Sequence, residues 1–116
     1  MALNHIQSGK TITLNNAAAL IKSGAPVLIG DLFGVALVDI PSGSSGEVAT
    51  EEVYALPKAT GAMTVGQIVY WDPAGTPVGA VGPGALTTTA GSLKRAGIVW
   101  AAAASDATTV NVKLNA

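Results

Sequence analysis

Hydrophobic and polar residues alternate with a period of two along much of the chain. Residues 10–14 (KTITL) alternate strictly, residues 26–30 (PVLIG) form a short apolar run between Pro and Gly, and residues 47–56 (EVATEEVYAL) predict one long, half-buried strand. Similar runs are FGVALVDI (33–40), QIVYWD (67–72), AGIVWAAA (96–103) and TTVNVKL (108–114). Period-two runs rich in β-branched residues are typical of β-strands.

Turn-forming residues separate these runs at short spacing. They occur in SGAP (23–26), PSGSSGE (41–47), DPAGTP (72–77), GPGA (82–85) and SDAT (105–108). Short strands with regular turns predict an all-β fold, either a small barrel or a sandwich, with Gly/Pro-rich loops. At most one short helix is expected. Residues Asn15–Gly24 form either that helix, with Asn as cap and Gly as stop, or an irregular crossing.

The two halves of the chain resemble each other. SGAPVLIGD, GVALVDIPSG and EVATEEVYAL in the first half are echoed by VGQIVYWDP, GIVWAAAASD and TTVNVKL in the second. Either a duplicated motif or the limited vocabulary of small β proteins explains this echo. The second half also carries a Gly/Pro-rich insertion, residues 73–92, which we expect to be a surface loop or a loose hairpin.

The chain has 116 residues, of which 49% are hydrophobic and only 11% charged. This length fits one β domain over residues 1–116, with residues 1–9 as an extended N-terminal arm. Soluble domains usually carry about 25% charged residues. A weakly charged surface suits a protein that covers itself with partners.

Charge and cysteine content exclude several function classes. The net charge is −1 and no basic stripe is present, so nucleic acid is not expected as a partner. The absence of cysteine excludes disulfides, thiolate chemistry and cysteine-based zinc sites. The longest apolar run, residues 98–104, is far shorter than the ~20 residues of a membrane helix, and no signal peptide is visible at the N-terminus.

Each candidate catalytic motif in the sequence lacks a residue or a structural context that it requires. The SGKT of residues 8–11 lacks the first Gly of a phosphate-binding loop, because Asn4 occupies that position, and a strand pattern follows it. His5 is the only histidine, and Glu51 and Glu52 are expected to point to opposite faces of a strand. The sequence therefore predicts no catalytic residue, no cofactor and no metal site.

Tyr70 and Trp71 are adjacent, which suggests either a ligand platform or a buried strand. In a strand Tyr70 and Ile68 face one side, and Trp71 and Val69 the other, so both faces are apolar. We expect this strand to be buried on both faces, by the core or by a neighbouring subunit. Asp72 then starts a turn by capping local amides.

Several phrases taken together resemble a known family. They are NHIQSGKTITL, SGAPVLIGDLFGVALVDIPSGSSGEVATEEVYALPKA, GQIVYWD and AGIVWAAAASDATTVNVKLN. In order and spacing they resemble the small phage capsid decoration (cement) proteins of the DUF2190 type. The resemblance covers nearly the whole chain.

The resemblance implies a non-enzymatic β-rich protein whose barrel or sandwich is of the β-clip or decoration-protein kind. It also implies a place on the outer surface of the virion, where the protein binds the major capsid protein and stabilises the assembled head. By analogy with other decoration proteins it implies a homo-oligomer, with a trimer favoured. The residues expected to contact the capsid or a subunit are Leu3, Asn4, His5, Ile6, Gln7, Tyr70 and Trp71. The N-terminal residues act either as a strand added to a capsid edge or as a frayed or intramolecular first strand.

A second hypothesis is a carbohydrate- or ligand-binding β-module of a phage or bacterial surface structure. In that case Tyr70 and Trp71, or Trp100, stack on sugar rings.

Overall fold

The computed structural model describes residues 4, 6, 9–79 and 83–116. These residues form an all-β fold, as predicted, and none of them lies in a helix. The strands are β1 (Thr11–Leu14), β2 (Pro26–Ile29), β3 (Leu32–Ala36), β4 (Gly46–Ala49), β5 (Val53–Pro57), β6 (Ile68–Asp72), β7 (Ala85–Thr87), β8 (Lys94–Ala101) and β9 (Thr109–Leu114).

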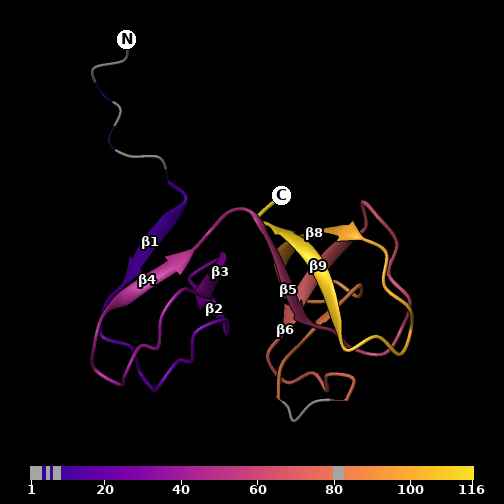
Figure 1. Ribbon diagram of the computed structural model, residues 1–116, viewed down its shortest axis with the longest axis horizontal. Coiled ribbons are helices and arrows are strands. Elements are labelled where there is room, and N and C mark those ends of the chain that lie inside the picture. Colours follow the sequence, from indigo (N-terminus) through magenta and orange to yellow (C-terminus); the bar gives the residue numbers. More distant parts are fainter. Residues whose placement is uncertain (1–3, 5, 7–8, 80–82) are drawn as a thin grey trace.

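The strands form two antiparallel sheets that lie side by side (Figure 1). The first sheet has the order β1-β4-β3-β2 and the second the order β5-β9-β8-β6-β7. The second sheet curls until Lys58, just after β5, forms a single parallel bridge with Leu86 of β7. One bridge does not make a ladder, so the architecture is sandwich-like and not a closed barrel.

Residues Asn15–Gly24 cross the first sheet irregularly, so the helix alternative is wrong. Asn16 has a φ of 53°, in the left-handed region that ends helices. Ile21 instead forms an antiparallel bridge with Ile40, and Ala17 is buried against the sheet. Packing of these apolar side chains on the sheet outweighs the weak helix propensity of the segment.

The single strand predicted over residues 47–56 is also wrong. β4 ends at Ala49 and β5 begins at Val53, and the two strands belong to different sheets. Of the three residues between them, Thr50 is buried, whereas Glu51 and Glu52 are exposed, and Glu52 has a φ of 79°. The chain turns here because it passes from one sheet to the other, so the two carboxylates are not on a strand.

The two sheets repeat one topology. In each sheet three strands follow one another as neighbours, and the strand that precedes them in the chain pairs with the last of the three. β1, β2, β3 and β4 form the first repeat, and β5, β6, β8 and β9 the second. β7 lies within the predicted insertion of residues 73–92 and has no counterpart in the first repeat.

The strand register repeats as well. In the first repeat Val35 pairs with Ala49, and in the second Ile98 pairs with Lys113 at the corresponding positions. The adjoining pairs also correspond: Ala36 with Val48 in the first repeat, and Val99 with Val112 in the second.

Hydrogen bonds outside the strands follow the same correspondence. The amide of Gly24 donates to the Ala36 carbonyl at 2.7 Å, and the amide of Gly66 donates to the Val99 carbonyl at 2.9 Å. These glycines have nearly equal φ angles, 86° and 85°. The sequence echo therefore has a structural counterpart at the level of single hydrogen bonds, which favours duplication over chance similarity.

Each sheet has an inner side, which its own crossing loop covers, and an outer side. The inner side of the first sheet carries Ala36 and Val48 in a small core, together with Ala17 and Ile40. The inner side of the second sheet lines the larger core. That core contains Phe33, Val35, Leu56, Met63, Val69, Leu86, Ala96, Val99, Val110, Val112 and Leu114.

Phe33 and Val35 in that list come from the outer side of the first sheet. The first repeat thus covers the larger core, and both repeats contribute side chains to it.

Candidate functional site

The two adjacent aromatic residues of β6 do not form one platform. Trp71 packs into the larger core, where its ring centroid lies 5.9 Å from that of Phe33 at an interplanar angle of 50°. Its ring also lies against Gly84, where a Cβ atom would come within 2.7 Å of two ring carbons. Tyr70 points to the outer side and is half-buried. The two rings therefore face opposite sides of the sheet.

The chain's own core buries β6 on one face, and burial of the other face by a neighbouring subunit stays a prediction. Val69 is fully buried, but Ile68 on the other face is 36% exposed. The outer side of the second sheet is thus open in the single chain. The predicted turn after β6 is confirmed, because Asp72 Oδ1 accepts a hydrogen bond from the Ala74 amide at 3.0 Å.

Trp100 is the most exposed aromatic side chain among the described residues. Its relative exposure is 58%, in a chain with only two Trp, two Tyr and one Phe. It lies at a β-bulge, where Trp100 and Ala101 together oppose Asn111 of β9. Bulges commonly re-aim a side chain, and here the bulge holds a large ring in solvent.

A shallow hollow of about 210 Å³ lies beside Trp100 in the chain. Its lining consists mainly of small side chains: Ala101, Ala102, Ala103, Ala104, Ala107, Thr109, Val110 and Asn111. Trp100 does not line this hollow, so the exposure of its ring alone makes it a candidate contact residue, because aromatic side chains are enriched among the anchors of protein interfaces.

Lys58 supports this hollow from inside. Its side chain is fully buried, and Nζ donates to the carbonyl oxygens of Ala104 and Ser105, both at 3.1 Å. Burying an ammonium group is costly unless hydrogen bonds replace its water. The two carbonyls supply those bonds and fix the loop between β8 and β9.

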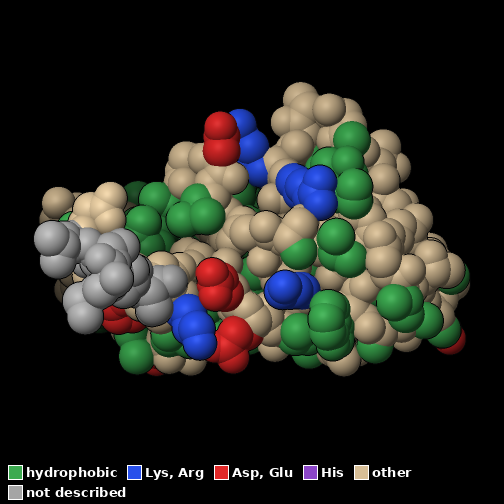
Figure 2. Space-filling view, turned by 90° about the horizontal axis from the view of Figure 1, so that it is seen from above, with side chains coloured by type: hydrophobic (Ala, Val, Ile, Leu, Met, Phe, Trp, Pro, Cys, Tyr) green, Lys and Arg blue, Asp and Glu red, His purple; other side chains and the backbone are tan. Residues whose placement is uncertain are grey.

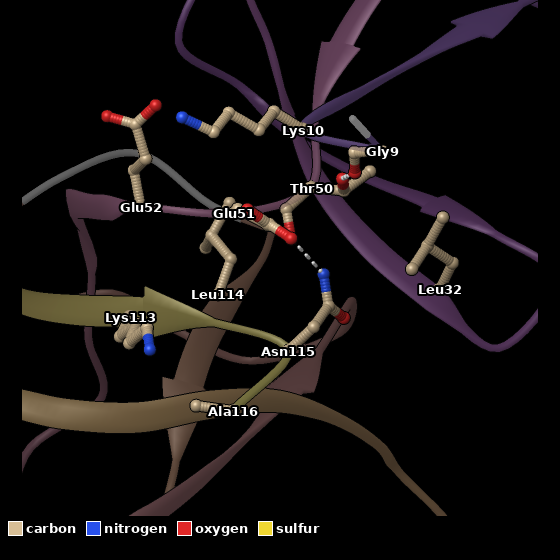
Figure 3. A pocket seen from close by; sticks show the side chains of 10 residues that line it. All are labelled: Gly9, Lys10, Leu32, Thr50, Glu51, Glu52, Lys113, Leu114, Asn115 and Ala116. Atoms are coloured by element: carbon tan, nitrogen blue, oxygen red, sulfur yellow. Dashed lines mark hydrogen bonds between the residues drawn. The ribbon is translucent and has the colours of Figure 1, made fainter. Parts of the chain in front are cut away.

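A groove of about 520 Å³ lies where the two repeats meet (Figure 3). Charged side chains of both signs line it: Lys10, Glu51, Glu52 and Lys113. Figure 2 shows acidic and basic side chains interspersed across the face seen from above. Such a mixed and open lining does not select one charged ligand.

Asn115 forms the floor of the junction and links both repeats. Its Nδ2 donates to the carbonyls of Phe33 and Thr50, both at 2.7 Å, and its Oδ1 accepts from the Phe33 amide at 3.3 Å. The bond to Thr50 is drawn in Figure 3. Asn115 has a φ of 55°, which Asn tolerates better than most residues.

One exposed ion pair also joins the repeats. Lys94 Nζ on β8 lies 2.5 Å from Asp31 Oδ1 in the turn between β2 and β3. The hydrogen bond from Lys94, and then its positive charge, lower the pKa of Asp31. Asp31 is exposed, so water screens the pair and it contributes little to folding.

The predicted N-terminal contact residues are only partly described. Leu3, His5 and Gln7 lie outside the described residues. Asn4 is exposed, and the side chain of Ile6 is 88% exposed. The strand that follows them, β1, belongs to the first sheet, whereas Tyr70 and Trp71 lie on β6 in the second.

Groups of metal-binding side chains are not found in the described part of the chain: no three His, Cys, Asp or Glu residues gather there. Over residues 9–79 and 83–116, no helix is long and apolar enough to cross a membrane.

The sequence pattern that defines phage cement proteins matches residues 6–114. The chain belongs to the phage cement protein family. The match is to the phage cement protein family, and it neither supports nor excludes the DUF2190 type in particular. Comparison with curated proteins and with solved structures found no match.

Membership in this family gives the protein a structural role in the phage capsid. Lys58 and Asn115 were not singled out from the sequence, and Trp100 was considered only as a sugar-stacking ring. A period-two count along residues 53–58 does place Lys58 on the inner side with Tyr54 and Leu56, which is a usable signal.

Proposed function

We propose that the protein binds the outer surface of the assembled phage head as a single β domain and stabilises it without catalysis. Membership in the cement family over residues 6–114 carries this proposal. A protein that binds the assembled lattice and not separate subunits stabilises the lattice by mass action, by about 2.7 kcal/mol per site at a hundredfold excess over the dissociation constant. A homotrimer gains further from avidity, about 10²–10⁴-fold.

Co-sedimentation tests this function. The purified protein is mixed with empty expanded capsids of the cognate major capsid protein, and separately with its unassembled subunits. We expect saturable binding to capsids alone and a higher melting temperature of the decorated capsids. Equal binding to free subunits, or none to capsids, would contradict the proposal.

The N-terminal residues are a proposed capsid contact. The exposure of Ile6 and of the edge strand β1 supports a segment that adds to a capsid sheet edge. Deleting residues 2–8 should weaken capsid binding, while the thermal transition of the isolated protein stays the same. Unchanged occupancy on capsids would reject this role.

Trp100 is a second proposed capsid contact. Aromatic anchors at interfaces typically contribute 2 kcal/mol or more, which is about 30-fold in affinity. Trp100→Ala should therefore weaken capsid binding by about 30-fold. Leu37 occupies the corresponding position of the first repeat and is 40% exposed, so Leu37→Ala is the matched control with an expected change under about threefold. Equal losses for both variants would show that Trp100 has no special part.

The exposure of Trp100 also keeps the carbohydrate-binding alternative testable. A shift of tryptophan fluorescence on adding glycans, lost in Trp100→Ala, would favour that alternative. Trp71 is packed against Phe33 and is not available for stacking in this structure.

A further inference from the structure

The two sheets end in four edge strands, β1 and β2 in the first and β5 and β7 in the second. An edge strand presents unpaired N–H and C=O groups that can pair with another chain, and proline or a very short strand protects such an edge. β2 begins with Pro26, β5 ends with Pro57, and β7 has only three residues. β1, with the sequence TITL, has no proline, no charged residue and no bulge. It is therefore the one unprotected edge among the described strands.

The free edge of β1 is open to solvent. Thr11, Ile12 and Thr13 are all exposed, and Figure 1 shows β1 at the end of the first sheet that lies away from the second sheet. The Thr50 amide donates to the Lys10 carbonyl at 2.9 Å, so the backbone groups of Lys10, and at period two those of Ile12, point toward β4. The N–H and C=O groups of Thr11 and Thr13 consequently point to the free edge.

β1 is complementary to a second copy of itself. When two copies lie antiparallel about a two-fold axis at Ile12, Thr11 of each copy pairs with Thr13 of the other. These are the residues whose backbone groups point outward, so each pair exchanges two hydrogen bonds and the ladder has four. Ile12 then faces Ile12 of the second copy as a non-hydrogen-bonded pair, in which side chains lie closest. Ile12 is 37% exposed in the single chain and would be covered by this contact.

We propose that the free edge of β1 pairs with β1 of a second copy and joins the two four-stranded first sheets into one. A second copy fits this edge better than an unrelated strand, because the pattern Thr-Ile-Thr is the same in both directions and matches Thr with Thr and Ile with Ile. The contact goes beyond the proposed function and is independent of its trimer. It leaves residues 2–8 for the capsid contact proposed above.

The expected strength of the pairing follows from its size. Four hydrogen bonds correspond to about 400–800 Å² of buried surface, at about one bond per 100–200 Å². Stable interfaces bury at least about 1,200 Å², so the pair is weak and reversible in solution. On the phage head, copies bound side by side have a high effective concentration, which favours the same contact.

A disulfide trap tests the pairing. In the proposed register the two Ile12 Cα atoms lie about 4.5 Å apart, which is within the range of a disulfide. The chain has no cysteine, so Ile12→Cys can form only this bond. After mild oxidation we expect most of this variant to migrate at twice the 11.4 kDa chain mass on a non-reducing gel. Thr11→Cys is the matched control, because the axis places Thr11 opposite Thr13 and away from its own copy, and it should couple at least tenfold less.

Thr11→Pro, added to Ile12→Cys, tests the backbone ladder. The Thr11 amide points outward and Thr11 is the first residue of an edge strand, where proline is tolerated, so the fold should persist and circular dichroism checks it. We expect the yield of disulfide dimer to fall several-fold, whereas Thr11→Val, which keeps the amide, should leave the yield unchanged.

The inference is overturned if Ile12→Cys does not couple, if both cysteine variants couple equally, or if Thr11→Pro leaves the yield as it was. Loss of capsid occupancy in Thr11→Pro without coupling of Ile12→Cys would assign the edge to the capsid instead of a second copy. Capsid co-sedimentation of the wild type is measured separately, so a failed trap with intact capsid binding leaves the proposed function standing.

Discussion

Replacing Gly97 by Ala should lower the free energy of unfolding by more than about 3 kcal/mol. A Cβ atom at Gly97 would lie 2.0 Å from the carbonyl oxygen of Lys113 and 3.0 Å from Cγ1 of Val112. The first of these is backbone of the paired strand β9, which cannot move aside without breaking the ladder. Overpacking of a core typically costs about 1–3 kcal/mol, and a clash with backbone belongs at or beyond the upper end.

Urea denaturation followed by circular dichroism measures this loss. Gly34 is the equivalent glycine, and a Cβ there would lie 2.8 Å from the Ala49 carbonyl oxygen and 2.4 Å from a Val48 methyl. Gly34→Ala should therefore also destabilise, though less. Gly24→Ala serves as control, since its φ is +86° but its surroundings are open, so only about 1–2 kcal/mol of backbone strain is expected. A Gly97→Ala variant as stable as the Gly24→Ala variant would refute the steric argument.

The paired glycines also show what the sequence could predict. Gly34 lies in the Gly-Val strand of the first half, and Gly97 in the Gly-Ile strand of the second. The segments that resemble each other in sequence form equivalent strands in the two repeats. The period-two alternation and the turn residues were sufficient to predict where most strands lie, because one face of each strand is buried. The echo alone did not decide between duplication and chance, since strand register is invisible in a single sequence.

Contacts between residues far apart in the sequence explain the two wrong predictions and the residue that was missed. Nothing local in residues 47–56 marks the passage between sheets, because Tyr54 and Leu56 lie an even number of residues from Val48 and so continue its alternation. The segment Asn15–Gly24 has residues compatible with a helix, but the bridge between Ile21 and Ile40, which is distant in the sequence, holds it in an extended conformation. Asn115 looks like a terminal polar residue until Phe33 and Thr50 are brought beside it.

Contact surfaces are harder to predict than the fold. An alternating pattern states which side of a strand is apolar, but not whether a second sheet, a second copy or solvent covers that side. Tyr70 and Trp71 illustrate this, since their patterns are equal and only Trp71 meets the core. The exposure of Trp100 has another cause. The pairing of its neighbours Val99 and Ala101 with β9 creates the bulge that holds the ring in solvent.

Replacing Lys58 by Ala should lower the free energy of unfolding by about 3 kcal/mol. The change leaves a cavity in place of the buried stem and removes both hydrogen bonds to the carbonyls of Ala104 and Ser105. Truncating a long buried side chain typically costs about 2–5 kcal/mol. Charge-assisted hydrogen bonds contribute about 1.5–3 kcal/mol each, but the cost of desolvating the ammonium group offsets part of that. Packing is therefore the larger part of the expected loss.

Lys58→Met separates the two parts, because it keeps most of the stem and removes only the donor. We expect it to lose about 1 kcal/mol and to speed hydrogen exchange in the loop between β8 and β9, where the two carbonyls are released. If Lys58→Ala and Lys58→Met were both as stable as the wild type, Lys58 would have no supporting part in this loop.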